Sequence, residues 1–427
     1  MPEIGPAQIA VVVFVAAYTL VIGDMVHRTI VALFAGFLIV ALGVIDQHTA
    51  LSHVDFNVIF LLIGMMVIAS VIGRSGFFLW LAALTVRATR GDPYRLLVAL
   101  SIVTAVLSAV LDNVTAVVLL APIAFSVAER RGIPPLPLLI SIVLASNIGG
   151  TATLIGDPPN IIIGSAFDKD FVAFLLHTGP AALVSLVLYL GLARWLFRRE
   201  LRAPALSVAE ARALGAFDRS TLDRRLAGRS LAVLGVTLLG FLLARPLGLE
   251  AATVALLGAS VVLLITRVDV HKVLGDVEWP TLLFFVGLFV LVGGLVETGV
   301  IARMAEATLG LTGGDPRATA FVVLWLSALL SAVVDNIPYT ATMVPLIQEL
   351  ARHGVNIEPS IWALALGADF GGNATLVGAS ANVVVASMSE ARGQPISFGQ
   401  FFKYGLPVAL MTMLVASLEL FIRYVVL

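Results

Sequence analysis

The chain repeats one pattern of polar and helix-breaking residues, and the second copy begins about 223 residues after the first. Gly91-Asp92-Pro93 recurs as Gly314-Asp315-Pro316, and Asp112-Asn113 recurs as Asp335-Asn336. One residue is then lost, so that a Gly-Gly pair recurs as Gly371-Gly372 at a spacing of 222. A repeat this long is not a solenoid, whose period is about 20–50 residues. The chain therefore consists of two related halves.

The composition is that of a polytopic membrane protein. Apolar residues make up 59% of the chain and charged residues 12%, against about 25% charged in soluble domains. The net charge of −1 gives no overall basic field, so we expect no nucleic-acid partner. The chain has no cysteine, which excludes disulfides, zinc-thiolate sites and thiolate chemistry.

Five apolar stretches in each half approach the length of about 20 residues that crosses a bilayer. They cover residues 7–23, 29–45, 57–73, 136–164 and 172–197, then 230–244, 251–266, 280–297, 360–389 and 404–422. An odd number of crossings turns the second half upside down. The sequence therefore predicts inverted repeats, an arrangement known from secondary transporters.

Two further apolar stretches, 95–128 and 318–350, are each interrupted at the centre by Asp-Asn. Each arm is too short to cross the membrane comfortably, so a re-entrant hairpin that enters and leaves on one side fits better. Non-helical backbone at membrane depth is tolerated where it is buried in protein or lines a cavity. The predicted fold class is thus an all-α polytopic membrane protein with about ten transmembrane helices and two re-entrant helical hairpins. Its units are a first repeat (1–197), a linker (198–229) and a second repeat (230–427).

The distribution of basic residues orients this layout. One side carries about 20 of the 26 Lys and Arg residues, eight of them in the linker 198–229. The positive-inside rule makes that side cytoplasmic. We therefore expect a multi-pass protein of the cytoplasmic (inner) membrane with both termini outside, in contact with the lipid bilayer throughout.

Four polar clusters fall at predicted membrane depth, at the two Asp-Asn tips and in the glycine-rich breaks of 136–164 and 360–389. An ionisable residue at this depth costs at least ~2.5–3.5 kcal/mol, so four aspartates there invite a functional explanation. The broken helices aim free backbone groups at a site. The candidate substrate- and ion-binding residues are Asp112, Asn113, Thr115, Asn147, Thr151, Thr153, Asn160, Asp335, Asn336, Asp369, Asn373, Thr375 and Asn382.

The candidates for proton coupling are Asp112, Asp335, Asp157 and Asp369, because a low-dielectric environment favours the neutral form of a carboxyl group. We expect no Lys or Arg near these clusters, which suits a cation, a proton or a neutral hydroxylated solute. Other interpretations remain open. Asp112 and Asp335 are also good helix N-caps, and Asp157, whose counterpart is Ala379, is equally suited to a turn before Pro158.

The string from Asn147 through Gly149-Gly150-Thr151-Ala152-Thr153 to Gly156-Asp157-Pro158-Pro159-Asn160 resembles the ion-transporter superfamily. This group contains arsenite-efflux permeases, P-protein-like permeases, sodium/proton antiporters and divalent-anion/sodium symporters. The hairpin tips are most similar to the arsenite-permease and P-protein-like branch, since the dicarboxylate branch has Ser-Asn-Thr there. The resemblance implies a transport domain of hairpins and broken helices that moves like an elevator against a scaffold, and a homodimer.

The first functional hypothesis is proton-coupled efflux of arsenite or antimonite, a small inorganic solute that is a neutral hydroxide at physiological pH. The alternatives are a sodium/proton antiporter and a sodium-coupled carboxylate symporter. The chain has no ATPase motif, so any use of ATP would need a soluble ATPase partner. We expect no enzyme activity, no cofactor and no bound metal.

Overall fold

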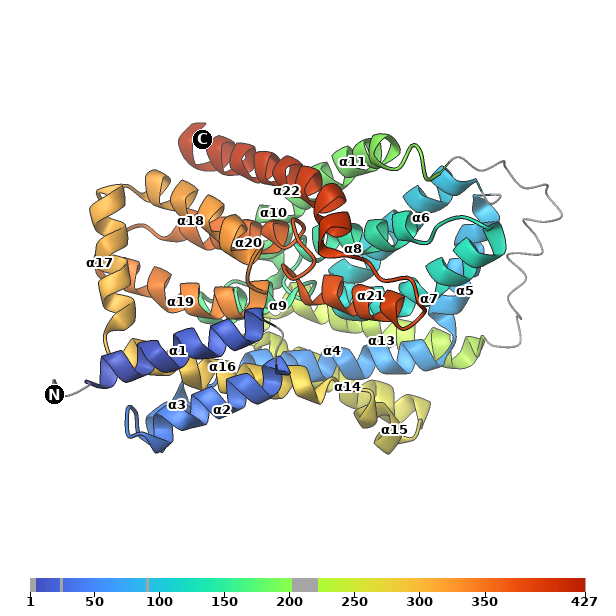
Figure 1. Ribbon diagram of the computed structural model, residues 1–427. Coiled ribbons are helices and arrows are strands. Elements are labelled where there is room, and N and C mark those ends of the chain that lie inside the picture. Colours follow the sequence, from blue (N-terminus) through green and yellow to red (C-terminus); the bar gives the residue numbers. More distant parts are fainter. Residues whose placement is uncertain (1–4, 24–25, 90–91, 202–221, 427) are drawn as a thin grey trace.

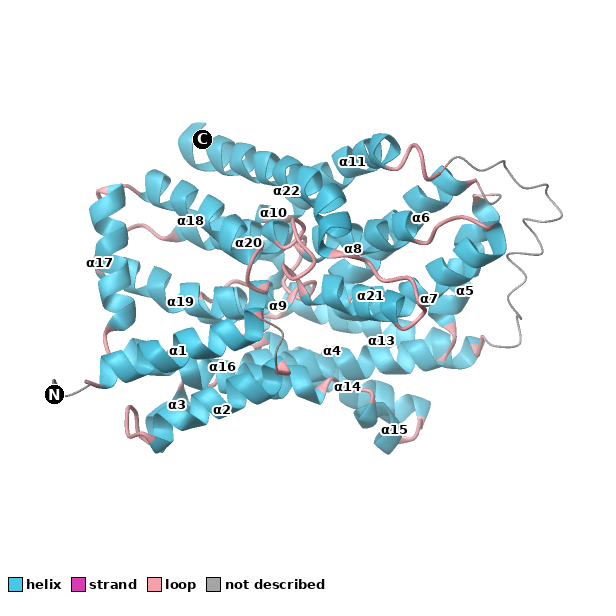
Figure 2. Ribbon diagram, in the orientation of Figure 1, coloured by secondary structure: helices cyan, strands magenta, loops and turns pink. Residues whose placement is uncertain are grey.

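The computed structural model describes residues 5–23, 26–89, 92–201 and 222–426, and every regular element in these ranges is a helix (Figure 1, Figure 2). The first half contains α1 (Pro6–Ile22), α2 (Arg28–Ala41), α3 (Gln47–Ser52), α4 (Phe56–Arg74), α5 (Phe77–Ala88), α6 (Pro93–Val110), α7 (Asn113–Arg131), α8 (Leu136–Gly150), α9 (Pro158–Ala166), α10 (Phe171–His177) and α11 (Gly179–Leu196). The second half contains α13 (Arg224–Leu243), the short η2 (Arg245–Leu247), α14 (Ala251–Thr266), α15 (Val270–Gly275), α16 (Trp279–Glu297), α17 (Val300–Thr312), α18 (Pro316–Ser331), α19 (Asn336–Arg352), α20 (Glu358–Gly371), α21 (Ser380–Glu390) and α22 (Phe398–Phe421), which ends in a π turn (Ile422–Val426). The prediction of an all-helical membrane protein is confirmed.

The helices repeat in the register of the sequence. The hairpin α6–α7 recurs as α18–α19, and the broken helix α8–α9 recurs as α20–α21. Figure 1 shows the two hairpins entering from opposite ends of the molecule, α18–α19 beside α17 and α6–α7 beside α5. This is the inverted arrangement that an odd number of crossings requires. The loops that interrupt the broken helices lie between them, in the middle (Figure 2).

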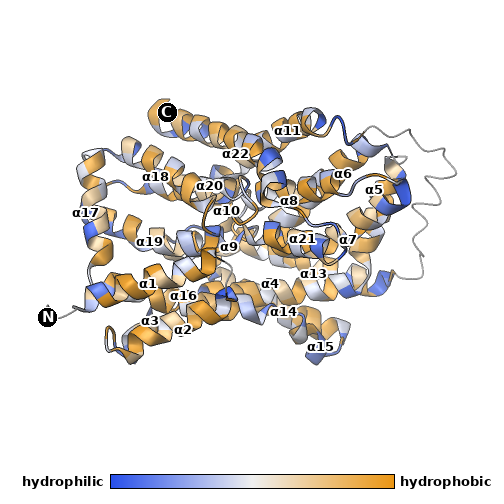
Figure 3. Ribbon diagram, viewed as in Figure 1, coloured by the Kyte–Doolittle hydropathy of each residue, from blue (hydrophilic) through white to orange (hydrophobic). Residues whose placement is uncertain are grey.

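Within the described residues, seven helices are long and apolar enough to cross a membrane by length and composition, namely α4, α6, α7, α11, α13, α16 and α22 with its extension. Most of the residues in these helices are hydrophobic (Figure 3). Two of the seven are the arms of the first hairpin, with 18 and 19 residues, so the expectation that each arm is too short to cross was wrong for the first hairpin. The arms of the second hairpin, α18 with 16 residues and α19 with 17, are not among the seven. The arms of the first hairpin gain length at their outer ends, where Asp92 starts α6 and the left-handed Gly132 (φ 62°) ends α7.

The start of each hairpin follows from local chemistry. Asp92 and Asp315 cap α6 and α18, and each is followed by a proline at the first helical position, where the missing N–H has no cost. The Asp315 carboxylate accepts hydrogen bonds from the backbone N–H groups of Ala318 and Arg317. These bonds lower the pKa of Asp315 below its ordinary value.

The ends of the predicted linker differ from expectation. Residues 202–221 lie outside the described residues, as do Gly91 and Asp24. At the other end α13 begins at Arg224 rather than at 230, because the carboxylate of Asp223 caps it by accepting from the N–H groups of Arg225 and Leu226. Part of the basic linker is therefore the first turn of a helix.

A scaffold layer is formed by α1, α2, α4, α13, α14 and α16, and it interleaves the two halves. Helix α2 of the first half packs along α16 of the second, and α14 packs along α4. Glycine permits both contacts. A Cβ atom on Gly36 would lie 2.5 Å from the carbonyl oxygen of Gly287, and one on Gly64 would lie 2.6 Å from the carbonyl carbon of Ala255. Because helices of the first half pack this closely against helices of the second, the scaffold layer is a single packing unit built from both halves.

A hairpin layer contains α6–α9 and α18–α21 and packs in the same interleaved way. Each broken helix lies against the arm of its own hairpin, α8 on α6 and α20 on α18, while α9 contacts α19 and α21 contacts α7 of the opposite half. The hairpin tips and the breaks of both halves are thereby brought to one place.

Candidate substrate and ion site

The two hairpin tips begin with an aspartate that caps the second arm. The N–H of Thr115 donates to Asp112 Oδ1 at 2.8 Å, and the N–H of Ile337 donates to Asp335 Oδ1 at 3.1 Å. The capping role proposed for both residues is present, but one oxygen of each carboxylate remains for other contacts. For Asp112 that contact is local, with the Thr115 hydroxyl donating to Oδ2 at 2.5 Å.

The breaks in the two broken helices fold back on the preceding helix. A Cβ atom on Gly150 would lie 2.6 Å from the carbonyl oxygen of Gly156, and one on Gly372 would lie 2.8 Å from that of Gly378. The paired glycines are therefore needed for the loop to close against the helix end. Pro158 then starts α9 in the first half.

Asp157 joins the two hairpin tips. It sits before α9 but makes no side-chain capping bond. Its Oδ2 accepts from Asn113 Nδ2 at 2.6 Å, and its Oδ1 accepts from Asn336 Nδ2 at 3.3 Å. Asn113 and Asn336 belong to different halves of the chain, so the carboxyl group of Asp157 contacts both hairpin tips. Asp157 also lies in a turn before Pro158, where its carbonyl oxygen accepts from the N–H of Asn160 at 3.0 Å, so its side chain adds a bridge between the halves to that turn.

A central cavity of about 10 Å³ lies between the tips, enough for roughly one water molecule. It is lined by Arg28, Leu62, Met66, Asp112, Asn113, Val114, Asp157, Pro158, Glu278, Thr281, Asn336, Ile337 and Ser380. Three of these residues are acidic and one is basic. At this volume the cavity holds no solute larger than a water molecule in this conformation, and its lining has an excess of negative charge.

The expectation of no basic residue near the clusters was wrong. Arg28, at the start of α2, places Nη1 2.9 Å from Asp335 Oδ2 and 2.6 Å from Ser380 Oγ, and Ser380 Oγ also donates to Asp335 Oδ2 at 2.7 Å. Arg28 belongs to the scaffold layer, and Asp335 and Ser380 to the hairpin layer. In the sequence Arg28 lies between the predicted spans 7–23 and 29–45. The segment between these spans was therefore expected to be a loop. Tertiary packing brings that loop against the second tip.

Six further candidates meet where the two broken helices cross. We call Asn147, Thr151, Asn160, Asp369, Asn373 and Asn382 the crossing cluster, and all six are fully or almost fully buried. Asn147 Nδ2 donates to Asn382 Oδ1 at 3.0 Å and to Asn373 Oδ1 at 3.2 Å. Asp369 belongs to this cluster and not to the lining of the central cavity.

Two of the predicted binding threonines have structural contacts. The hydroxyl of Thr153 donates to the carbonyl oxygen of Ala109, and that of Thr375 to the carbonyl oxygen of Ala332, both at 2.5 Å. Each threonine thereby ties a break to the end of its own hairpin arm, where a carbonyl lacks a helical partner. We assign them to support of the loops.

The cavity lining also contains Glu278 and Ser380, which, like Arg28, were not among the residues predicted from the sequence. Glu278 directly precedes α16. Thr281 donates to Glu278 Oε2 at 3.3 Å. The signal available in the sequence was an acidic residue directly before an apolar helix. A solvent-exposed acidic N-cap residue gives the same pattern, so the sequence does not distinguish the two.

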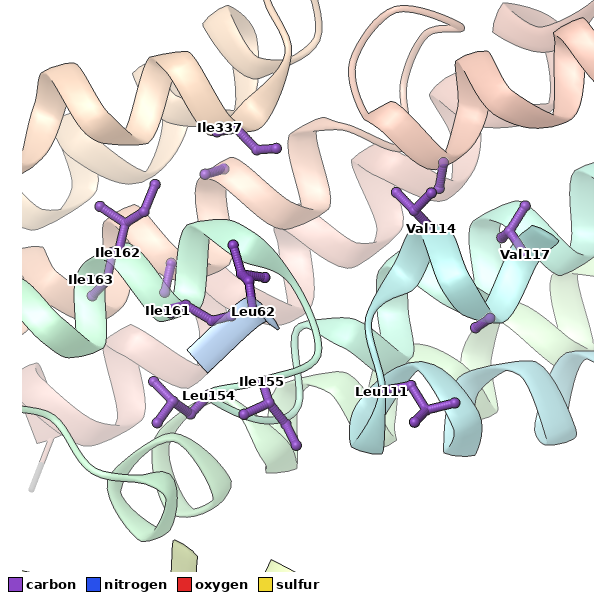
Figure 4. Close-up of a cluster of buried hydrophobic side chains, with 14 of the residues drawn as sticks. Leu62, Leu111, Val114, Val117, Leu154, Ile155, Ile161, Ile162, Ile163 and Ile337 are labelled. Carbon is purple, nitrogen blue, oxygen red and sulfur yellow. The ribbon is translucent and has the colours of Figure 1, made fainter. Parts of the chain in front are cut away.

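A larger cavity, the vestibule, has a volume of about 700 Å³ and is lined by the ends of α9 and α13 and the starts of α4, α10 and α14. Asp170 and Arg245 approach to 3.8 Å in its wall. The vestibule reaches Leu154 and Ile161 beside the first break. Leu62, which lines the central cavity, belongs to the same cluster of buried hydrophobic side chains as Leu154 and Ile161 (Figure 4).

The comparison with known families agrees with this architecture. The family model described as citrate transporter matches residues 18–367. The chain belongs to the citrate transporter family. The resemblance to the ion-transporter superfamily is thereby confirmed, and the chain is a membrane transporter.

Relatives in this family differ in length. Uncharacterized transporter Rv2684 of Mycobacterium tuberculosis (strain ATCC 25618 / H37Rv) is 43% identical over 427 residues, covering 98% of this chain and 99% of the relative. The P protein of Homo sapiens is 33% identical over 502 residues, covering 98% of this chain and 60% of the P protein. The crystal structure of the Alcanivorax borkumensis YdaH transporter matches with a TM-score of 0.59 and 18% identity, over 92% of this chain and 98% of that chain. At that identity the match shows the fold alone.

Proposed function

We propose that this member of the citrate transporter family is a secondary active transporter that exchanges protons for a small neutral solute. The first candidates for the solute are arsenite and antimonite, carried outward as hydroxides. One observation carries the proposal. Asp112, Asp157 and Glu278 face a single basic side chain, Arg28, whose guanidinium is already paired with Asp335.

An anionic solute would meet this excess of negative charge in a site of low dielectric constant, where like charges repel strongly. A hydroxylated neutral solute meets carboxylate and amide groups that form hydrogen bonds with it. Protons fit the same site, since each carboxylate that takes up a proton lowers the repulsion among the others. The proton-coupling candidates remain Asp112, Asp335, Asp157 and Asp369.

We further propose that the hairpin layer moves against the scaffold layer as in an elevator. With the termini on the outer face of the cytoplasmic membrane, as the charge bias predicts, the vestibule opens outward. The Arg28–Asp335 pair then holds the opposite side closed. A homodimer would hold the scaffold layer in place through contacts with a second copy of the chain. Exchange driven by a proton gradient needs no soluble ATPase partner.

Two alternatives have an observation in their favour. Both carboxylate oxygens of Asp369 are buried and have no hydrogen-bond partner in the part of the chain that the structure describes, which suits sodium/proton antiport. The description of the matching family, and the presence of Arg28 at the second tip, favour a carboxylate such as citrate.

Transport by purified protein in proteoliposomes with an imposed pH gradient separates these candidates. Arsenite, antimonite, Na⁺ and citrate are offered in parallel, and both uptake and the decay of the gradient are followed. Accumulation of arsenite or antimonite that depends on the gradient and is lost in Asp157→Asn supports the proposal. Gradient decay with Na⁺ alone, or accumulation of citrate alone, assigns the chain to one of the alternatives.

A further inference from the structure

The crossing cluster contains two amides whose orientation is fixed by the breaks. Asn382 Nδ2 donates to the carbonyl oxygens of Gly372 and Thr375, both at 2.8 Å. Asn160 Nδ2 donates in the same way to those of Gly150 and Thr153, at 3.3 and 3.0 Å. Because each NH₂ group is used by its own loop, the Oδ1 atom of each amide points away from that loop, into the crossing cluster.

One of these two oxygens has a donor. Asn382 Oδ1 accepts from Asn147 Nδ2 of the opposite half at 3.0 Å. The repeat places Asp369 at the position equivalent to Asn147, and Asn160 at the position equivalent to Asn382. By this equivalence, the side chain at 369 takes the position toward Asn160 that Asn147 takes toward Asn382, and Asp369 and Asn160 do interact.

The equivalent contact has no donor when Asp369 is ionised. Asp369 interacts with Asn160 and Thr151, yet among the described residues neither of its carboxylate oxygens nor Asn160 Oδ1 has a hydrogen-bond partner. Asp369 and Asn160 are completely buried. The hydroxyl of Thr151 donates to the carbonyl oxygen of Asn147 at 2.8 Å, so its oxygen offers lone pairs. Acceptors that face one another without water are destabilising.

We propose that Asp369 is protonated in this conformation and is the residue that binds and releases the coupled proton. With one proton, the carboxyl group presents an O–H where Asn147 presents an N–H. That O–H donates to Asn160 Oδ1 and restores the hydrogen bond of the first half. When the proton leaves for water, this hydrogen bond is lost and the crossing cluster holds an unpaired negative charge.

The surrounding charges support this assignment. Helix α20 packs against α8, α9, α18, α19 and α22. Asp157, directly before α9, interacts electrostatically with Asp369 and with Asp335, directly before α19. Asp157 accepts two amide N–H bonds and Asp335 pairs with Arg28, whereas both carboxylate oxygens of Asp369 lack a hydrogen-bond partner among the described residues. Of these three neighbouring carboxyl groups, Asp369 is therefore the one whose charged form is left without a donor. The Ser331 hydroxyl of α18 donates to the carbonyl oxygen of Ala368 and not to the carboxyl group of Asp369.

The role in coupling rests on the proposed function, whereas the protonated state does not. The first test is therefore independent of substrate. Infrared difference spectra of the full-length protein in lipid, recorded at neutral pH in sodium-free H₂O and D₂O, report the C=O stretch of a protonated carboxyl group. We expect this band in wild type minus Asp369→Asn, and an unchanged band in Asp157→Asn. The variant Asn147→Asp should add a second such band, because the repeat makes the two positions equivalent.

Absence of the band from the wild-type minus Asp369→Asn spectrum would overturn the proposal. Replacement of the band by an ionised-carboxylate signal on addition of NaCl would also overturn it, in favour of a sodium site. Asp369→Asn supplies an N–H where the protonated acid supplies an O–H, so we expect it to fold. If Asp369→Asn does not fold, the wild-type spectra measured with and without sodium still decide the test.

The second test uses arsenite as the probe in proteoliposomes. Asp369→Asn is expected to abolish accumulation driven by the pH gradient while retaining arsenite counterflow at zero gradient. Gradient-driven accumulation that persists in Asp369→Asn would overturn the coupling role. Absence of arsenite transport in the wild type would overturn the substrate proposal instead, and the infrared result would still decide the state of Asp369.

Discussion

Replacing Arg28 with alanine is expected to change which side of the transporter is open. In the described conformation the vestibule is open at one end, while Arg28 of the scaffold layer bonds to Asp335 and Ser380 of the hairpin layer. The repeat places Ala251 at the position of Arg28, so the vestibule side has no equivalent pair. The ion pair therefore stabilises this conformation relative to one in which the layers have moved apart at that point.

The magnitude follows from the geometry. At an effective dielectric constant of about 20, unit charges at the 2.9 Å separation of the pair attract by about 6 kcal/mol. Desolvation of both groups, and the 28% exposure of the Arg28 side chain, reduce the net contribution to about 1–3 kcal/mol, between exposed and fully buried pairs. A loss of about 1–3 kcal/mol changes the ratio of the two conformations by roughly 5–150-fold.

The assay uses the absence of cysteine from the chain. Ser165→Cys places one thiol in the vestibule lining, and its rate of labelling by a bulky water-soluble maleimide in lipid nanodiscs reports the vestibule-open population. We expect Arg28→Ala to slow labelling strongly and Arg28→Lys to slow it less. The matched control is Arg74→Ala, which removes an ion pair with Asp276 at 2.6 Å within the scaffold side. Equal labelling rates in Arg28→Ala and Arg74→Ala would refute the reasoning.

Three further changes have defined outcomes. Gly371→Ala places a Cβ atom 2.5 Å from Ala328 Cα and should destabilise the fold by about 1–3 kcal/mol, measured as a lower midpoint of thermal aggregation, whereas Gly191→Ala, with open space around it, should not. Asp157→Asn puts an NH₂ group where two amide donors converge and should lower the free energy of unfolding by about 1.5–3 kcal/mol. The same aggregation assay measures this effect, and an unchanged midpoint would contradict the bridging role of Asp157. Asp315→Ala should lower the midpoint at neutral pH. Because its helix-capping bonds hold the pKa of Asp315 below 3.8, this contribution is present above about pH 4 and lost as the pH falls through the folded-state pKa; a difference from wild type that is unchanged in acid would refute this account.

The sequence predicted the positions of the polar interruptions well. The Asp-Asn pairs lie at the two hairpin tips, and the Gly-Gly pairs lie at the breaks, because these residues have local reasons to end or start a helix. Arm length was predicted less well, since α7 continues for a full span before Gly132 ends it. Where apolar helix gives way to polar surface, composition alone does not say which residue is the last.

The site was predicted as a set of residues but not as an arrangement. Asp157 was identified, yet its contacts with both tips depend on packing between the halves. Thr153 and Thr375 support loops through contacts with their own hairpin arms. Arg28 was missed because a basic residue between two apolar runs has the same appearance in the sequence whether it faces solvent or a buried carboxylate.

The sequence by itself determined that this protein is a two-fold repeated helical membrane transporter, because repeat register, hydropathy and helix-breaking residues act over short stretches of chain. It also held the substitution of Asp369 for Asn147, the one change of charge at the crossing of the broken helices. Only the tertiary structure decided the roles of these residues. Contacts such as Arg28 with Asp335 and Asn147 with Asn382 join positions more than 200 residues apart, and the free energy of a buried charge is set by the donors and acceptors that packing brings to it.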